Sequence, residues 1–195
     1  MDSRVIELQC IMPTSNIDSV LANGILSYER AARLPHHSVA LQPVQDRRDR
    51  TQVPGGLRLH QYANLYFHAR NPMLFKRLAE VSTLCVLRVS TDVLSLPGVV
   101  ITGENAASSY VRFLAPAQWQ LLKWDDIFAL DWRHPGDKIA YWQHKSRKCA
   151  EVLVPHRVDA RFIMGAYVVD AAAQASLAAL GCALSISINQ ALFFR

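Results

Sequence analysis

One acidic residue of the chain lies in a setting that suggests chemistry. Glu151 is the only carboxylate in the run from Cys149 to Pro155, CAEVLVP, which is otherwise apolar and predicts a β-strand. Strand alternation places its side chain on the face opposite Ala150 and Val152. The carboxylate is either a solubilising charge on an edge strand, which is common, or a functional group held in a fixed position. The run by itself favours the first explanation, so the choice depends on the rest of the chain.

A basic third of the chain supplies a second set of candidates. Between Tyr28 and Arg77 there are nine basic and three acidic residues, whereas the other residues sum to about neutral and the whole chain carries a formal net charge of +5. The basic residues include Arg47, Arg48 and Arg50, and the interleaved aromatic and imidazole side chains are His36, His37, His60, Tyr62 and Tyr66. This composition suits a polyanion, either nucleic acid or the pyrophosphate of a dinucleotide. Charge alone equally allows a solvated face that binds nothing.

The cysteines and histidines predict neither disulfides nor a metal site. The cysteines form no CxxC pair and lie in apolar runs, so we expect reduced core residues. They are Cys10, Cys85, Cys149 and Cys182. His36 and His37 are adjacent in a predicted loop, and the other histidines lack partners at ligand spacing, so no metal is expected.

The chain shows no signal for export or membrane insertion. Its first seven residues, MDSRVIE, carry acidic and polar residues where a signal peptide needs a basic and then an apolar stretch. The most apolar region, residues 163–188, is interrupted by Asp170 and Gln174, which favours a buried helix between two strands over a membrane span. We therefore expect a cytoplasmic protein without a membrane partner.

The elements that must position these residues predict an α+β fold. The 195 residues show no composition shift, so we expect a single domain over residues 1–195. Strands are predicted over residues 5–12, 63–68, 84–89, 99–102, 149–154, 161–168 and 183–188. Helices are predicted over residues 17–23, 72–78, 118–122 and 170–180. Because strands outnumber helices and do not alternate regularly with them, the sheet is expected to be split and mostly antiparallel.

Local signals also predict a helix cap and two long loops. Ser15 or Asn16 is expected to cap the first helix, with Asp18 near its positive end, and Gly24 to end it in a left-handed conformation. Residues 29–56 contain three prolines and little periodicity, which predicts a long loop with at most one helical turn. Residues 123–142 are polar, aromatic and broken by Pro135 and Gly136, as in a mobile substrate loop.

Three segments, in their order and spacing, resemble those of one known protein family. The first combines residues 15–18, SNID, with residues 24–26, GIL, and is similar to the helix after the family's first strand. The second, residues 38–73, is similar to a basic QxRR element, a VP-GG turn, a YF strand and a PM-initiated helix. The third, residues 147–155, RKCAEVLVP, resembles the strand around the family's catalytic glutamate. The family is that of the DarT DNA ADP-ribosyltransferases. The resemblance spans nearly the whole chain and implies an ADP-ribosyltransferase-like fold.

The resemblance implies roles for three of the candidate residues. Glu151 matches the catalytic glutamate, which is expected to hydrogen-bond the 2'-hydroxyl of the nicotinamide ribose of NAD+ and stabilise positive charge on that sugar. One carboxylate suffices because nicotinamide needs no strong acid to leave, unlike the leaving group of a glycosidase. Arg48 matches the arginine that contacts NAD+ and helps activate the acceptor base; since a guanidinium is a poor proton acceptor, we expect it to bind phosphate or stabilise the deprotonating base. Tyr66 is expected to stack beneath the nicotinamide ring, with an inward-facing core tyrosine as the alternative.

Further contacts follow from the same resemblance. Residues 31–50 match the family's NAD-covering element, and residues 105–151 are expected to contain the loop that selects the acceptor. Where the family carries a histidine to hold the adenosine ribose, this chain has residues 12–15, MPTS. Cofactor contacts are therefore expected at Thr14, Ser15 and Ser27, beside Arg48 and Tyr66. DNA contacts are expected at Arg47, Arg50, Trp132, Tyr141 and Trp142, whose aromatic members suit stacking on unpaired bases.

The expected activity is transfer of ADP-ribose from NAD+ to a base in single-stranded DNA. Thymine is the base that the resemblance implies, and guanine is the alternative if the missing histidine marks a divergent branch. The resemblance also implies a toxin that a DarG-like macrodomain antitoxin neutralises in the bacterial cytoplasm. Two other functions stay open: an ADP-ribosyltransferase acting on RNA or protein, and a catalytically weakened relative that binds nucleic acid with strong salt dependence.

Overall fold

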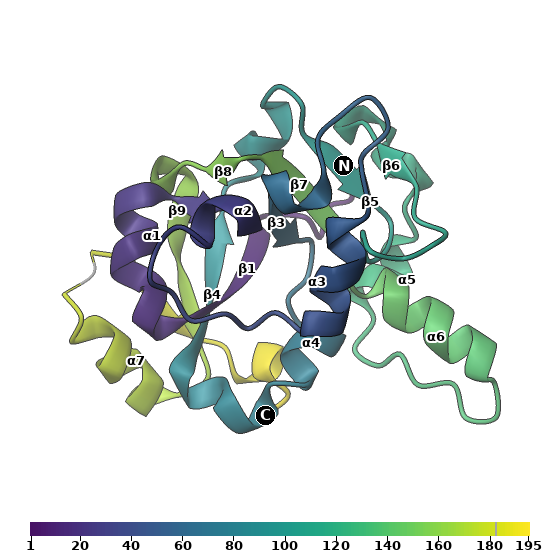
Figure 1. Ribbon diagram of the computed structural model, residues 1–195. Coiled ribbons are helices and arrows are strands. Elements are labelled where there is room, and N and C mark those ends of the chain that lie inside the picture. The colour runs from purple at the N-terminus through teal and green to yellow at the C-terminus, as the bar shows by residue number, and fades with distance from the viewer. Residues whose placement is uncertain (182) are drawn as a thin grey trace.

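The chain folds around a mixed sheet with helices on its faces (Figure 1). The computed structural model describes residues 1–181 and 183–195. Within these residues an eight-stranded sheet runs in the order β10-β9-β4-β1-β3-β7-β5-β6, and β2 and β8 form a separate pair. Neighbouring strands are antiparallel except β9 and β10. The strands are β1 (Leu8–Pro13), β2 (Ile25–Leu26), β3 (Tyr62–Tyr66), β4 (Leu84–Val89), β5 (Val100–Thr102), β6 (Phe113–Leu114), β7 (Glu151–Pro155), β8 (Arg157–Val158), β9 (Ile163–Val168) and β10 (Ile186–Ile188). The predicted α+β, mostly antiparallel fold is confirmed.

The sheet has a weak seam at its centre. β1 pairs with β4 over six residue pairs, but β1 and β3 meet at a single pair, Gln9 with Tyr66. β3 then pairs with β7 along its full length. The strand ladder therefore joins the two halves through one residue pair, as expected of a split sheet, and Tyr66 belongs to that pair.

The helices lie on the sheet and beyond one end of it. They are α1 (Ile17–Asn23), α2 (Tyr28–Ala31), α3 (Gln42–Asp49), α4 (Pro72–Phe75), α5 (Trp124–Phe128), α6 (Lys138–Arg147) and α7 (Ala171–Ala178). Figure 1 shows α2 and α3 in front of the strands, joined by residues 32–41, which cross the same face and are called the strap below. α6 projects away from the body.

Both regions predicted as long loops contain more helix than expected. Residues 29–56 hold the eight-residue α3, and residues 123–142 hold α5 and the start of α6. α3 was missed because helices are recognised by an apolar stripe, whereas its one buried residue is Arg48. α6 begins where the Asp137 side chain accepts a hydrogen bond from the Ala140 amide, a cap signal that the aromatic composition obscured.

The start of α1 also differs from the prediction. Asn16 precedes the helix but makes no side-chain cap, because its amide bonds to His37 in the strap instead. Gly24 ends α1 with the expected positive φ of +81°, but its ψ of 179° is extended rather than left-handed helical. A Cβ there would lie 2.2 Å from the carbonyl oxygen of Val158, so glycine is required at this crossing.

The remaining predictions concern shorter features. Residues 118–122 were predicted as helix and lie mostly in a 3-10 helix, Pro116–Leu121. Three predicted core cysteines are buried, namely Cys10, Cys85 and Cys149. The fourth, Cys182, lies outside the described residues.

Candidate active site

Glu151 is an interior residue of the sheet and not an edge charge. It is the first residue of β7, which lies between β3 and β5, and its side chain is 1% exposed. Its backbone amide donates to the Thr102 hydroxyl on β5 at 3.2 Å. An ionisable side chain is almost never this buried without partners. The solubilising explanation of the sequence run is therefore wrong.

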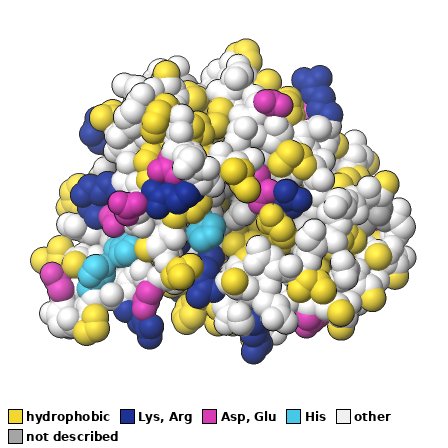
Figure 2. All heavy atoms as spheres, turned by 180° about the vertical axis from the view of Figure 1, so that it is seen from behind, with side chains coloured by type: hydrophobic (Ala, Val, Ile, Leu, Met, Phe, Trp, Pro, Cys, Tyr) yellow, Lys and Arg dark blue, Asp and Glu magenta, His cyan; other side chains and the backbone are white. Residues whose placement is uncertain are grey.

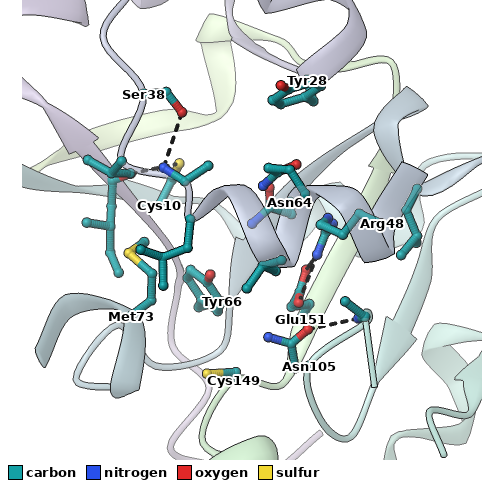
Figure 3. Close-up of a pocket in the computed structure, with 18 of the residues that line it drawn as sticks. Cys10, Tyr28, Ser38, Arg48, Asn64, Tyr66, Met73, Asn105, Cys149 and Glu151 are labelled. Atoms are coloured by element: carbon teal, nitrogen blue, oxygen red, sulfur yellow. Dashed lines mark hydrogen bonds and ion pairs between the residues drawn. The ribbon is translucent and has the colours of Figure 1, made fainter. Parts of the chain in front are cut away.

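Arg48 is the principal partner of Glu151. Its Nη1 donates to both carboxylate oxygens, at 2.9 Å to Oε2 and 3.2 Å to Oε1 (Figure 3). The Ala106 amide donates to Oε1 at 3.0 Å. The negative charge is thus fixed by one cation and one backbone dipole, and charge-assisted bonds of this kind are the strong ones in proteins. The two residues that sequence analysis judged most important lie in direct contact.

Both side chains line a cavity of about 850 Å³, within the range of about 300–1,000 Å³ that small-molecule sites occupy. Its walls come from β1, β3, the strap, α3, the loop after β5 and α6. Arg47 also lines this cavity, whereas Arg50 is exposed and does not. Arg50 lies one residue beyond the end of α3, Gln42–Asp49.

Tyr66 lies on the cavity floor directly opposite Glu151 in the β3–β7 ladder. Its ring is buried, at 8% exposure, and Figure 3 shows it pointing toward the site. Burial, followed by the nearby Glu151 charge, raises the pKa of the Tyr66 hydroxyl well above its usual value. Tyr66 therefore stays a neutral aromatic surface beside the carboxylate.

The thiols at this end of the cavity are not nucleophiles. Cys10 and Cys149 both line it, and burial raises the pKa of each thiol to about 12. A thiol is nucleophilic as the thiolate. Covalent catalysis by these cysteines is therefore disfavoured near neutral pH.

The three hydroxyl residues expected to hold the cofactor do not line the cavity. Thr14 donates to the Thr83 carbonyl, and Ser15 bonds to the His37 ring at 3.0 Å. Ser27 is buried and caps α2 by accepting from the Arg30 amide. Their cofactor contacts stay predictions, and in this structure the three hydroxyls take part in local hydrogen bonds.

A histidine does reach this wall, from a part of the chain that sequence analysis did not connect to it. His37 in the strap lines the cavity. The Asn16 carboxamide clamps its backbone, with Nδ2 donating to the His37 carbonyl at 2.7 Å and Oδ1 accepting from the His37 amide at 2.9 Å. Further along the strap, the Arg77 Nη2 donates to the Val39 carbonyl oxygen at 2.8 Å. No local signal could have paired residues 16 and 37.

The three aromatic residues expected to stack on DNA have different settings. Trp132 is 7% exposed and packs edge-on against Phe75 and Phe194, so it is a packing residue and is not available for stacking. Trp142 is 64% exposed on α6 and lines the cavity. Tyr141 is half-buried beneath the Lys145 ammonium and lies outside the lining.

Tyr110 is a further aromatic residue at the cavity mouth that sequence analysis missed. It is 88% exposed, in the loop after β5, and it lines the cavity as Trp142 does. Its sequence neighbours SSYVR carried no motif. Exposure of a large ring beside a cavity is visible only in the folded chain.

Outside the cavity, the features that could indicate another function are metal sites, membrane-spanning helices and charged or apolar patches. Among residues 1–181 and 183–195, no group of three metal-ligating side chains lies close together. No helix in this part of the chain is long and apolar enough to cross a bilayer. On the face opposite to that of Figure 1, acidic, basic and apolar side chains are intermixed rather than gathered by kind (Figure 2).

Comparison with known proteins agrees with this geometry. A family model described as "ssDNA thymidine ADP-ribosyltransferase, DarT" matches residues 11–194. A DNA ADP-ribosyl transferase and DNA ADP-ribosyl glycohydrolase fusion protein of Thermosipho africanus is 30% identical over 182 residues, covering 87% of this chain and 44% of the fusion. A DNA ADP-ribosyl transferase of a Thermus species is 28% identical over 152 residues, covering 71% and 69%. The chain thus spans less than half the length of the fusion relative.

Solved structures show the same fold. Thermosipho africanus DarTG in complex with ADP-ribose superposes with a TM-score of 0.82 at 26% identity, over 96% of this chain and 51% of that one. Thermus DarT in complex with ADP-ribosylated single-stranded DNA superposes with a TM-score of 0.83 at 22% identity, over 97% and 96%. Since the family model covers nearly the whole chain, this protein belongs to the DarT family.

Proposed function

We propose that the chain transfers ADP-ribose from NAD+ to a thymine base in single-stranded DNA and releases nicotinamide. The observation that carries this proposal is a buried carboxylate, Glu151, fixed by Arg48 and exposed only to a cavity of ligand size. The family description names the same acceptor. Thermus DarT, solved in complex with NAD+ and in complex with ADP-ribosylated single-stranded DNA, has the same fold.

The lining residues fit NAD+. The cavity combines one fixed anion, Glu151, with further cations of the lining such as Arg47 and Lys76, and with an aromatic floor, Tyr66. A ribose hydroxyl requires an acceptor, a phosphate requires a cation, and a pyridine ring requires a flat apolar surface. The strap covers the wall distant from Glu151, which suits residues 31–50 to enclose the cofactor.

Each residue then has a defined task. Glu151 accepts a hydrogen bond from a ribose hydroxyl and stabilises the positive charge that develops as the bond from the sugar carbon to nicotinamide breaks. The bonding electron pair leaves with nicotinamide. A ring nitrogen of the base forms the new bond to the same carbon, and its proton passes to solvent. Arg48 stabilises the negative charge that gathers on the base as that proton leaves.

The acceptor base enters at the mouth formed by the loop after β5 and by α6. Tyr110 and Trp142 expose large rings there, and base stacking on such rings contributes about 1–3 kcal/mol per base. Arg47 and Lys145 add positive charge on the lining. Single strands are favoured because a base in a duplex must first be unstacked to reach the carboxylate.

The fusion relative indicates a partner. In that protein a DNA ADP-ribosyl transferase is joined to a DNA ADP-ribosyl glycohydrolase. We therefore propose that this chain acts as a toxin in the bacterial cytoplasm and that a DarG-like macrodomain antitoxin removes its product.

A labelling assay tests the activity. The chain is incubated with NAD+ labelled in the adenosine half and with oligonucleotides of single-stranded DNA, duplex DNA or RNA. Label should appear only on thymine-containing single strands and should be abolished by Glu151→Ala. Arg48→Ala should reduce it by about 10²–10³-fold, the usual effect of removing one group that stabilises transition-state charge. Label on RNA, on duplex DNA or on the protein itself would reject the proposed acceptor.

A further inference from the structure

Asn64 is a polar residue in the interior of the sheet whose presence packing does not explain. Along β3 the side chains alternate, so that Tyr62, Asn64 and Tyr66 line the cavity while Ala63 and Leu65 are buried in the core behind it. Asparagine is depleted in strands because it fits a pleated apolar surface poorly. Its position at the middle of a central strand therefore calls for a partner.

No such partner exists within the described part of the chain. Its carboxamide forms no hydrogen bond there, whereas two other polar side chains of the lining are engaged: Arg48 with Glu151, and Asn16 with His37. A carboxamide offers two N–H donors and one acceptor oxygen. The half-buried amide lines the cavity and is therefore accessible to a bound group rather than enclosed in the core. The free amide therefore points to a ligand that enters the cavity.

The strand register places this amide next to the catalytic carboxylate. Tyr66 is opposite Glu151 and Asn64 is opposite Leu153, so Asn64 is the diagonal neighbour of Glu151 on the same face. Diagonal neighbours are about 7–8 Å apart at the backbone, which long polar side chains span together with a small bound group. Figure 3 shows Asn64 among the side chains that line the cavity, together with Arg48, Tyr66 and Glu151.

We infer that Asn64 is a further substrate-binding residue, whose carboxamide hydrogen-bonds the ribose hydroxyl adjacent to the one that Glu151 holds. This inference rests on the proposed function. A ribose has two neighbouring hydroxyls, and each acts as donor and acceptor. With Glu151 taking the 2'-hydroxyl, the diagonal residue on the same strand face is in position for the 3'-hydroxyl. The sugar is then held at two points, which fixes its carbon against the incoming base.

Binding of a non-hydrolysable NAD+ analogue tests the contact without depending on catalysis. Calorimetry on the whole chain compares wild type with Asn64→Ala, and the analogue with its counterpart that lacks the 3'-hydroxyl of the nicotinamide ribose. Losing one hydrogen bond to a neutral group should raise Kd by about 2- to 10-fold. Wild type should therefore bind the deoxy analogue more weakly, while Asn64→Ala should bind both analogues with equal, reduced affinity.

Controls separate this contact from general effects. Asn23→Ala makes the same change on α1, where the amide bonds to the Ser19 carbonyl and lies outside the cavity, and it should leave both Kd values unchanged. If Asn64→Ala does not fold, the comparison of the two analogues on wild type still decides. Equal wild-type affinity for them, or an Asn64→Ala penalty that persists on the deoxy analogue, overturns the inference. Wild type that binds neither analogue refutes the proposed function as well.

Discussion

Removing Arg48 while keeping Glu151 should destabilise the folded chain as well as abolish efficient transfer. Arg48→Met keeps most of the side-chain volume but leaves the Glu151 carboxylate, at 1% exposure, with the Ala106 amide as its remaining described donor. Breaking a buried ion pair in this way costs about 3–5 kcal/mol because an uncompensated charge stays buried. Breaking an exposed ion pair lowers the free energy of unfolding by only about 0–1 kcal/mol.

The expected magnitude lies between these limits. Both side chains line a cavity that water can enter, so solvent partly replaces the lost guanidinium. We therefore expect Arg48→Met to lower the free energy of unfolding by about 2–3 kcal/mol. Glu151→Gln should lower the free energy of unfolding by less. The oxygen of the new carboxamide still accepts from the Ala106 amide, and Arg48 can turn toward the cavity.

Urea unfolding of the two single variants and of the double variant measures the coupling. The double variant should be more stable than the sum of the single effects predicts, by about 1 kcal/mol or more, because it leaves neither charge alone. Strictly additive effects, or Arg48→Met as stable as wild type, would refute the reasoning: they would mean that solvent screens the pair and that Glu151 is not held by Arg48.

Three further predictions concern other residues. Burial is the main cause that lowers the pKa of His68 from 6.5 to about 4, so on acidification the unfolded chain binds a proton before the folded chain does. The free energy of unfolding should therefore fall by about 2 kcal/mol between pH 7 and about pH 5. Urea titrations at the two pH values should show that His68→Gln removes this difference. Trp142→Ala should weaken binding of single-stranded DNA by about 1–3 kcal/mol, measured by fluorescence anisotropy, and leave the melting temperature of the protein unchanged. Trp132→Ala should instead lower the free energy of unfolding by about 3–5 kcal/mol. The reverse pattern would mean that Trp132 stacks on DNA and that Trp142 is the packing residue. Gly24→Ala should destabilise by about 2 kcal/mol or more, since its φ is +81° and its Cβ would meet a carbonyl oxygen at 2.2 Å, and a neutral effect on thermal unfolding would contradict this geometry.

Local pattern was sufficient for the strands that carry the site. The alternation of residues 149–154 placed Glu151 correctly on the face opposite Ala150 and Val152, because alternation is a property of neighbours along one strand, and residues 63–68 were correctly predicted to contain a strand. Local pattern did not predict the helix α3, whose one buried residue is an arginine, or the helical part of residues 123–142. Helix prediction depends on an apolar stripe, and neither segment has a strong one.

The sequence by itself determined that a lone carboxylate lies on a strand, that arginines gather between residues 47 and 50, and that the chain resembles one family. Tertiary structure alone decided that Glu151 is interior, that Arg48 and not Arg50 faces it, and that Trp132 is packed while Trp142 is exposed. The physical reason is separation along the chain. Arg48 and Glu151 are 103 residues apart, and burial and ion pairing depend on such distant contacts rather than on the periodicity of either segment.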